Sequence, residues 1–469
     1  MRNKISISEN KMEFIENMFA VALMIYAMLS SNGLTFGKPI IKPFMWASFL
    51  LSAVILLYRA FNIKEYFRFP ETLLALILVG SIGISTLINR NYSFKSNIVF
   101  CIYWVFYFLV LFTTGKSKKT DSIKKSMRIV SVTFISYTTL SAIVGFILYF
   151  AGVNKTYAVP GEHYAYYLGF KWGRLWGIFL SPNHGAISCA VSIMLFIYIF
   201  KSRKKQWIRI CSVLGIILHL MYIVFADSRT GTVVLAAGIA TYVFVVCLKT
   251  VENKKIGIKI LTFAMSLCIA VVCFAGVRQL RKPINGTISL INSQLDKTNN
   301  KEHDADIIER GYDLSEDISN RRFDVWKSGV EVFLHSSKNM AFGLSHCGFT
   351  EYAEQHLPKT YIVNNDHAVM TTLDNELLNI LISNGIFGIV GSVAFVAYII
   401  VFVIKKFTSV KAEDKFFIAL NLAILFSLAC AAMFASVMFF HFSPNAVFFW
   451  LALGQLMTYL NAGENKNGI

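Results

Sequence analysis

Long apolar runs separated by short polar breaks fill most of this chain of 469 residues. A membrane-spanning helix needs about 20 mainly apolar residues, and the runs come close to that length. The runs at residues 73–87 and 233–248 contain no charged residue, whereas the strands of a membrane barrel alternate in polarity over roughly ten residues. Charged residues make up only 15% of the chain, against about 25% in soluble domains. The sequence therefore predicts an all-α polytopic membrane protein.

About twelve transmembrane helices are expected, with one large extracytoplasmic loop before the tenth. The predicted spans are residues 12–31, 44–61, 71–89, 96–113, 129–151, 177–200, 209–226, 230–248, 258–277, 373–404, 416–440 and 444–461. Helices 1–9 then lie within residues 1–277, the loop occupies 278–372, helices 10–12 lie within 373–461, and 462–469 form a short tail. The first run shows no cleavable signal pattern and is interpreted as a retained helix.

The net charge of +18 gathers in alternate connections between the spans. Loops rich in Lys and Arg face the cytoplasm, so these connections and both termini are predicted on the cytoplasmic side of a bacterial inner membrane. In the long outer loop, acidic and basic residues are nearly equal in number. The positive charge is thus explained by orientation, and no nucleic-acid partner is expected. The basic residues of the connections are Lys116, Lys118, Lys119, Lys124, Lys125, Arg128, Lys201, Arg203, Lys204, Lys205, Lys249, Lys254, Lys255, Lys259, Lys405, Lys406, Lys411 and Lys415.

The outer loop has two parts of different composition. Residues 285–315 are rich in Asn, Asp, Glu, Lys and Gly with few aromatic residues, which predicts poor order. In residues 318–334 the apolar side chains recur at near-helical spacing, which predicts an amphipathic helix over the outer membrane face. Of the eight cysteines only Cys347 lies in this loop, so no disulfide framework is expected there.

The chain has no phosphate-cradling glycine loop, no paired-cysteine site and no zinc-binding histidine pair around a glutamate. Neither a metal nor a cofactor is predicted.

Ionisable groups at the outer ends of the spans are the best candidates for functional residues, because a charge beside hydrocarbon tends to mark a site. In RLWGIFLSPN, residues 174–183, Arg174 is expected at the outer membrane boundary. Gly177 and Pro182 interrupt the helical pattern, so we expect backbone groups and Asn183 to face a polar cavity. The alternative is a snorkelling arginine before an ordinary helix.

A second candidate is ADSRTG, residues 226–231, a very short turn between two apolar spans. Turn chemistry explains the Asp, Ser and Gly, but it does not call for Arg229, whose guanidinium can hold two phosphate oxygens. We favour a functional role for Arg229, with Asp227 in support. The alternative is a local ion pair between these two residues that anchors the turn.

A third candidate lies at residues 364–388, where acids, amides and a histidine precede the tenth span. Asp374, Asn375 and Glu376 fall in the first helical turn, where acidic residues are favoured in any helix. Helix capping would explain them. A carboxylate at the membrane surface is also suited to act as general base for a sugar hydroxyl, and Asp374 and His367 compete for that role.

Together these segments resemble the O-antigen ligase and O-antigen polymerase (Wzy-type) superfamily of bacterial polysaccharide enzymes. RLWGIFLSPN is similar to the family's Arg-x-x-Gly-x-Phe-x-x-Pro-Asn segment, and DSRTG to its Ser-Arg turn. SNRRFDVWKSGVEVF at 319–333, followed by FGLSHCGF at 342–349, resembles its outer-loop pattern, and DNELLNILISNGIFG at 374–388 resembles its return into the membrane.

The resemblance implies a GT-C-like enzyme that transfers a glycan from an undecaprenyl-diphosphate carrier to an acceptor hydroxyl on the outer face, without nucleotide sugar or metal. In the family, arginines bind the diphosphate, a role that falls here to Arg174, Arg229 and Arg322, with Arg321 as the alternative match to Arg322. Positive charge there would stabilise the departing diphosphate. The implied partners are the lipid-linked donor and acceptor and the bilayer, with a flippase and a chain-length regulator as candidate protein partners.

The ligases of this family commonly begin the last motif with His-Asn, whereas this chain has Asp374 and Asn375, as looks common in polymerases. We therefore predict a polysaccharide polymerase, with a ligase that uses a different acceptor as the alternative. The base stays open between Asp374 and His367. A transporter or flippase is a further alternative, but it should carry charges in mid-span, and residues 130–150 and 430–440 carry none.

Overall fold

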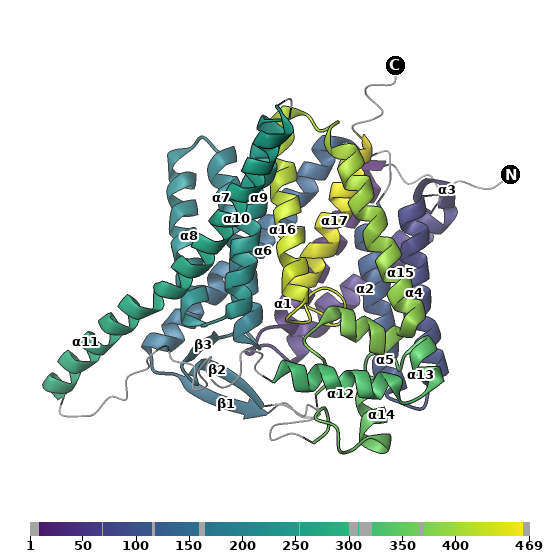
Figure 1. Ribbon diagram of the computed structural model, residues 1–469, viewed down its shortest axis with the longest axis horizontal. Coiled ribbons are helices and arrows are strands. Elements are labelled where there is room, and N and C mark those ends of the chain that lie inside the picture. The colour runs from purple at the N-terminus through teal and green to yellow at the C-terminus, as the bar shows by residue number, and fades with distance from the viewer. Residues whose placement is uncertain are drawn as a thin grey trace.

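The protein is a bundle of long helices (Figure 1). The structure, a computed structural model, describes residues 9–67, 69–114, 118–158, 165–252, 254–299, 308, 321–364 and 370–462, and the side chains of 291–299 are not included. Within these residues, 11 helices are long and apolar enough to cross a membrane. The predicted all-α polytopic fold is confirmed.

The helices are bounded as follows: α1 Glu9–Ser30, η1 Pro39–Ile41, α2 Lys42–Phe61, α3 Ile63–Tyr66, α4 Pro70–Ile88, α5 Phe94–Trp104 continued by the π-helix η2 Val105–Phe112, α6 Thr120–Phe150, α7 Pro182–Ser202, α8 Gln206–Phe225, α9 Arg229–Thr250, α10 Ile256–Gln279, α11 Arg281–Asn299, α12 Arg322–Leu334, α13 Ser337–Phe342, α14 Gly348–His356, α15 Glu376–Phe407, η3 Ala412–Asp414, α16 Lys415–Ala432 and α17 Pro444–Ala462. Several helices begin at a proline, which suits the first helical turn because its N–H has no partner there.

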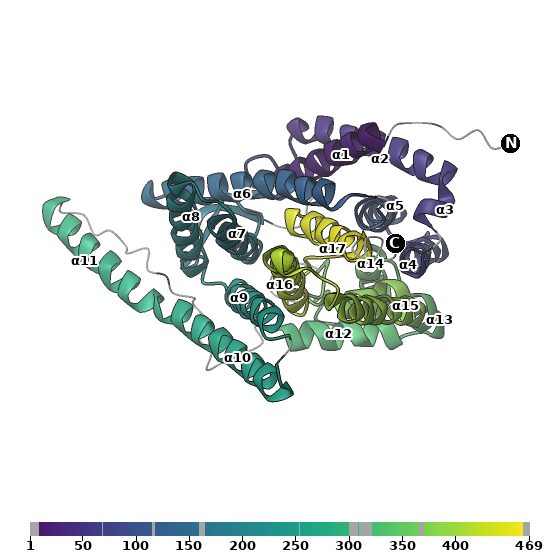
Figure 2. The same ribbon diagram turned by 90° about the horizontal axis from the view of Figure 1, so that it is seen from above.

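The helix α17 takes the place of the twelfth predicted span, and it is not one of the 11 candidate spans. It lies in the middle of the bundle (Figure 2), and residues 444–460 are all buried. Because it faces protein rather than lipid, it can carry polar groups: the Asn445 Nδ2 donates to the Ser188 Oγ of α7 at 3.0 Å. Its Trp450 packs against Phe108, with ring centroids 4.3 Å apart.

A small antiparallel sheet lies between α6 and α7, and the sequence reading missed it. Its strands are β1 Asn154–Ala158, β2 Ala165–Lys171 and β3 Arg174–Gly177, in the order β1-β2-β3. Lys171 pairs with Arg174, so Trp172 and Gly173 form the turn between β2 and β3. The span predicted from residue 177 instead begins at Pro182, because residues 174–177 are extended in the sheet.

The outer-loop predictions are partly wrong. The segment expected to be poorly ordered, residues 285–315, is helical over 285–299 as part of α11, which continues outward from α10 (Figure 1). Residues 300–307 and 309–320 lie outside the described part. The predicted amphipathic helix is present as α12, from Arg322 to Leu334. Its Val325 and Val332 are buried while Phe323 is exposed, and the helix packs on α13 and α15.

The two ends of the bundle differ. The connections α7–α8, α9–α10 and α15–α16 lie at the same end as the start of α1 and the end of α17 (Figure 1), and we call this the terminal end. The sheet and helices α12 to α14 lie at the opposite end, which we call the sheet end. The chain thus gathers its basic connections at one end and its candidate site residues at the other.

Candidate functional site

Arg174 begins β3 at the sheet end and is held by two other elements. Its Nε donates to the Ala226 carbonyl oxygen at 2.8 Å, and its Nη2 donates to the Asn183 Oδ1 at 2.8 Å. The same Asn183 oxygen accepts from the Ser228 Oγ at 2.9 Å. A single amide therefore joins the sheet, the start of α7 and the turn before α9. We call Arg174, Asn183, Ser228 and Arg229 the arginine cluster.

Arg229 is the first residue of α9 and is half-buried. Ser228 caps this helix, since its Oγ accepts from the Gly231 N–H at 3.0 Å. A helix N-terminus carries partial positive charge from its unpaired N–H groups, and the Arg229 guanidinium adds a full charge beside it. Positive charge therefore gathers at the start of α9, next to the buried Asp227.

The supporting residue Asp227 is buried and bonds to two arginines that the sequence reading did not single out. Its Oδ1 accepts from the Arg278 Nη1 at 3.3 Å, and its Oδ2 accepts from the Arg281 Nη1 at 3.2 Å. Both arginines come from the α10–α11 junction. Their position at the end of the next span was the signal that could have identified them. Asp227 thus ties this junction to the turn before α9.

A second group of candidates surrounds the start of α12, and the structure distinguishes its two adjacent arginines. Arg322 is half-buried and its Cζ lies 6.0 Å from the centroid of the Phe434 ring, a cation–π distance. Its Nε is buried without a hydrogen-bond partner among the described residues. Arg321 is exposed, and its Nη1 donates to the Tyr361 hydroxyl at 3.4 Å.

Asp374 lies directly before α15 with a backbone φ of +51°, a left-handed conformation that is uncommon outside glycine. The residue as a whole is exposed, but its carboxyl group is partly desolvated by the surrounding protein. Burial raises the pKa of its carboxyl above the ordinary value, and the nearby Arg322 guanidinium lowers it in part. We call Arg322, Asp374, Asn375 and Phe434 the Asp374 cluster.

Asn375 and Glu376 both have structural roles, as the capping interpretation expected for this turn. The Asn375 Oδ1 accepts from the Leu378 N–H at 3.2 Å and caps α15, while its Nδ2 donates to the Met433 carbonyl oxygen at 3.3 Å. Glu376 is buried and does more than cap. Its Oε1 accepts from the backbone N–H groups of three consecutive residues, Val437, Met438 and Phe439, at 2.8, 2.8 and 3.1 Å. This carboxylate fixes the non-helical connection between α16 and α17 beneath the Asp374 cluster.

Two motifs distant in sequence meet at a break in α15. The helix is interrupted at Gly385, which has a φ of +69°. The carbonyl oxygens of Ile382 and Ser383 accept from the N–H groups of Leu344 and Ser345 at 2.8 and 2.9 Å. The segment at residues 342–349 therefore packs directly against the start of α15.

His367 lies outside the described residues. In the connections at this end, burial lowers the pKa of His346 to about 3 and that of His441 to about 4. Both are neutral near pH 7 and add nothing to the positive charge of the arginines. No group of three His, Cys, Asp or Glu side chains that could hold a metal occurs in the described parts of the chain.

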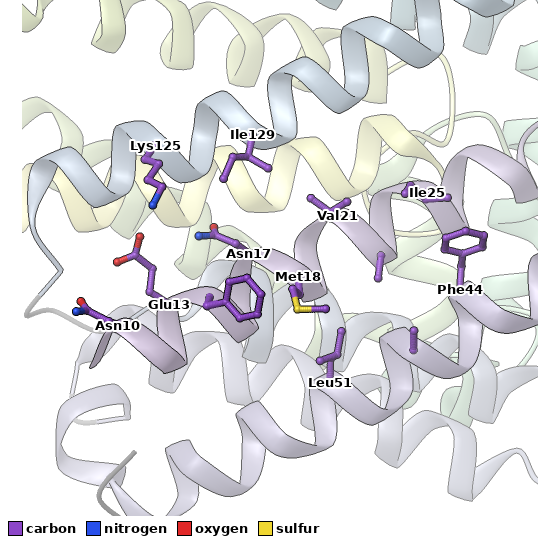
Figure 3. Close-up of a pocket in the computed structure, with 13 residues that line it drawn as sticks. Asn10, Glu13, Asn17, Met18, Val21, Ile25, Phe44, Leu51, Lys125 and Ile129 are labelled. Carbon is purple, nitrogen blue, oxygen red and sulfur yellow. The ribbon is translucent and has the colours of Figure 1, made fainter. Parts of the chain in front are cut away.

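A groove of about 880 Å³ lies elsewhere, between α1, α2 and α6 (Figure 3). Glu13 and Lys125 point toward each other at its polar end, and Phe14, Met18 and Leu51 line its apolar part. This groove begins at the terminal end, and neither cluster contributes to it. Although this groove is large, it is lined by none of the candidate site residues.

The fold is that of a multi-pass membrane protein, and the two clusters of polar residues lie at one end of its bundle. In both views the start of α12 lies beside α9 at the sheet end (Figures 1 and 2). Residues 214–393 match the model of a family described as O-antigen ligase. The match contains Asp227, Arg229, Arg322 and Asp374, while Arg174 precedes it.

The family match confirms the resemblance to the O-antigen ligase and polymerase superfamily. It supports a ligase- or polymerase-type role in polysaccharide biosynthesis at a membrane. Among curated proteins, no match was found.

Proposed function

We propose that the protein is a polymerase that joins undecaprenyl-diphosphate-linked oligosaccharide repeat units on the outer face of the cytoplasmic membrane. The observation that carries the proposal is the gathering of the arginine cluster and the Asp374 cluster at one end of a helix bundle that contains an O-antigen ligase family match. The orientation rests on the basic connections at the opposite end.

The reaction would proceed by attack of a sugar hydroxyl on the anomeric carbon of the donor. As the new carbon–oxygen bond forms, the bond from the anomeric carbon to the diphosphate breaks, and the Asp374 carboxylate accepts the hydroxyl proton. Undecaprenyl diphosphate leaves with the bonding electrons. Arg174, Arg229 and Arg322 would bind its oxygens, and positive charge held in place before the reaction stabilises such a transition state.

Asp374 is suited to act as the base because its pKa is raised above that of an ordinary aspartate. A base with a pKa closer to the working pH accepts a proton more readily in the transition state. His367 is retained as the second candidate for the base. The proposal requires no metal ion.

A ligase is the second candidate function, because the matching family model is described as O-antigen ligase. The Asp374–Asn375 pair in place of His-Asn favours the polymerase. Purified protein supplied only with lipid-linked repeat units separates the two: a polymerase makes a ladder of products, whereas a ligase makes none until a different acceptor is added. Movement of the lipid across a vesicle membrane without bond formation would instead support a flippase.

A further inference from the structure

We propose that Tyr167, Trp172 and Trp176 form a platform that binds the glycan chain next to the arginine cluster. This inference rests on the proposed function, since it concerns how the same site holds its carbohydrate. The three rings come from β2, β3 and the turn between them. None of the three was singled out from the sequence.

The three rings lie close enough to form one surface. The centroid of the Tyr167 ring lies 4.5 Å from that of Trp172 and 4.9 Å from that of Trp176, and the two tryptophans are 6.1 Å apart. Trp172 is 60% exposed, while the other two are half-buried and support it. An exposed aromatic ring that is supported by two others is a suitable surface on which one face of a sugar ring can stack.

The platform adjoins the arginine cluster through β3. Successive side chains of a strand point to opposite faces, so residues two positions apart share a face. Arg174 and Trp176 are two positions apart on β3. The Trp176 carbonyl oxygen also accepts from the Tyr222 hydroxyl at 2.8 Å, which fixes this strand to α8. A glycan whose diphosphate contacts Arg174 therefore has its sugars near the platform.

The backbone of the turn holds Trp172 in a conformation that is unfavourable for a bulky residue. Trp172 and Gly173 have φ values of +51° and +64°. A two-residue hairpin turn with both φ values positive favours Asn-Gly, and a bulky side chain at its first position is strained. Such strain in a folded protein points toward function.

The chemistry of the platform fits a carbohydrate. The face of an aromatic ring is electron-rich and attracts polarised C–H groups such as those on one side of a sugar ring. The Lys171 Nζ lies 5.8 Å from the Trp172 ring centroid and 6.0 Å from that of Tyr167. This ammonium can donate hydrogen bonds to sugar hydroxyls at the edge of the rings.

Anchoring in the lipid interface is the competing explanation, because Trp and Tyr are enriched there. Trp46 of α2 provides the matched control, since it is also 60% exposed and lies on a candidate span. A tryptophan that only anchors the protein should behave like Trp46. A tryptophan that binds glycan should affect the reaction in proportion to the length of the bound chain.

The test compares Trp172→Ala, Trp172→Phe and Trp46→Ala in full-length protein with lipid-linked acceptors of one repeat unit and of many. For Trp172→Ala, kcat/KM should fall at least about fivefold with the long acceptor and less with the single unit, as expected for a lost stacking contact. Trp172→Phe should restore most of the activity, and Trp46→Ala should match the wild type. Equal losses with both acceptors, or equal losses in Trp172→Ala and Trp46→Ala, would overturn the proposal.

A binding experiment separates this inference from the proposed function. Free oligosaccharide of several repeat units is titrated into wild-type protein and Trp172→Ala while saturation-transfer NMR follows the sugar protons. A saturation-transfer signal that is at least about fivefold weaker in the variant supports the platform, even if the wild type makes no polymer. Equal transfer in both proteins contradicts the platform even if the wild type polymerises.

Discussion

Arg59 at the terminal end and Arg322 at the sheet end show two different uses of arginine. Arg59 is completely buried, and both of its terminal nitrogens are bonded: its Nη2 donates to the Glu16 Oε1 at 2.6 Å, and its Nη1 donates to the Val110 carbonyl oxygen at 3.1 Å. Glu16 also pairs with Lys118. Arg322 is half-buried and lies over the Phe434 ring; an Nε without a hydrogen-bond partner among the described residues is common to both arginines.

The difference separates a structural arginine from a ligand-binding one. A buried arginine with a carboxylate partner and two carbonyl acceptors fixes helix positions and has little capacity for a ligand. An arginine held over a ring keeps its donors for an anion. The same contrast extends to the carboxylates, because Glu16 is paired with two cations while Asp374 is exposed beside one. Substitutions at the two ends should therefore have different effects.

The largest effect is expected for Asp374→Asn, which removes the proposed base while keeping the shape of the side chain. We expect the rate of bond formation to fall by about 10²- to 10⁴-fold, the usual contribution of general base catalysis. The rate is measured with purified protein and lipid-linked repeat units. Asp324→Asn on the exposed side of α12 is the control and should stay near wild type. Full activity of Asp374→Asn would place the base elsewhere, with His367 as the next candidate.

Arg229→Lys should have the next largest effect. Lysine keeps the charge but cannot hold two oxygens in a planar fork, so kcat/KM should fall by about tenfold to a hundredfold. Arg209→Lys, on an exposed site near the start of α8, is the matched control at the terminal end. The diphosphate role of Arg229 is excluded if both variants retain near-normal activity.

The positions of most helices, and of the two ends of the bundle, could be predicted from the sequence, because long apolar runs and basic connections determine where helices begin and end. The clusters at the sheet end were found because Arg174, Arg229 and Asp374 lie next to these ends. The sheet was missed because its strands have only four to seven residues, too few for a clear periodic pattern. The pairing of Asp227 with Arg278 and Arg281, and the contact of Glu376 with the residues before α17, join segments about 50 to 60 residues apart and leave no local signal.

Arg59→Leu should change stability and leave the chemistry intact. It removes one of the two cations that pair with Glu16. Breaking a buried pair typically costs about 3–5 kcal/mol, and the cost should be smaller here because Lys118 still pairs with the carboxylate. The melting temperature in detergent should therefore drop, while the activity of the protein that stays folded is unchanged. Lys64→Leu, at an exposed position nearby, is the control and should not lower the melting temperature. A loss of activity at full stability would make Arg59 part of the site.

The smallest effect concerns pH. The base must be deprotonated to act, so the rate should fall as pH decreases through the raised pKa of Asp374. Arg322 lowers that pKa in part. Replacing Arg322 with Gln should therefore raise it further and move the acid limb of kcat/KM to higher pH, while Arg321→Gln should not. An acid limb that stays in place in Arg322→Gln would show that Asp374 does not control it.

The most direct test of the account is a count of products from wild-type protein in liposomes supplied only with lipid-linked repeat units. We predict a ladder of glycans, with one undecaprenyl diphosphate released for each bond formed. In Asp374→Asn, bond formation and release of undecaprenyl diphosphate should decrease together. A ladder that appears only after a second kind of acceptor is added would contradict the polymerase. Release of carrier lipid without bond formation would also contradict it.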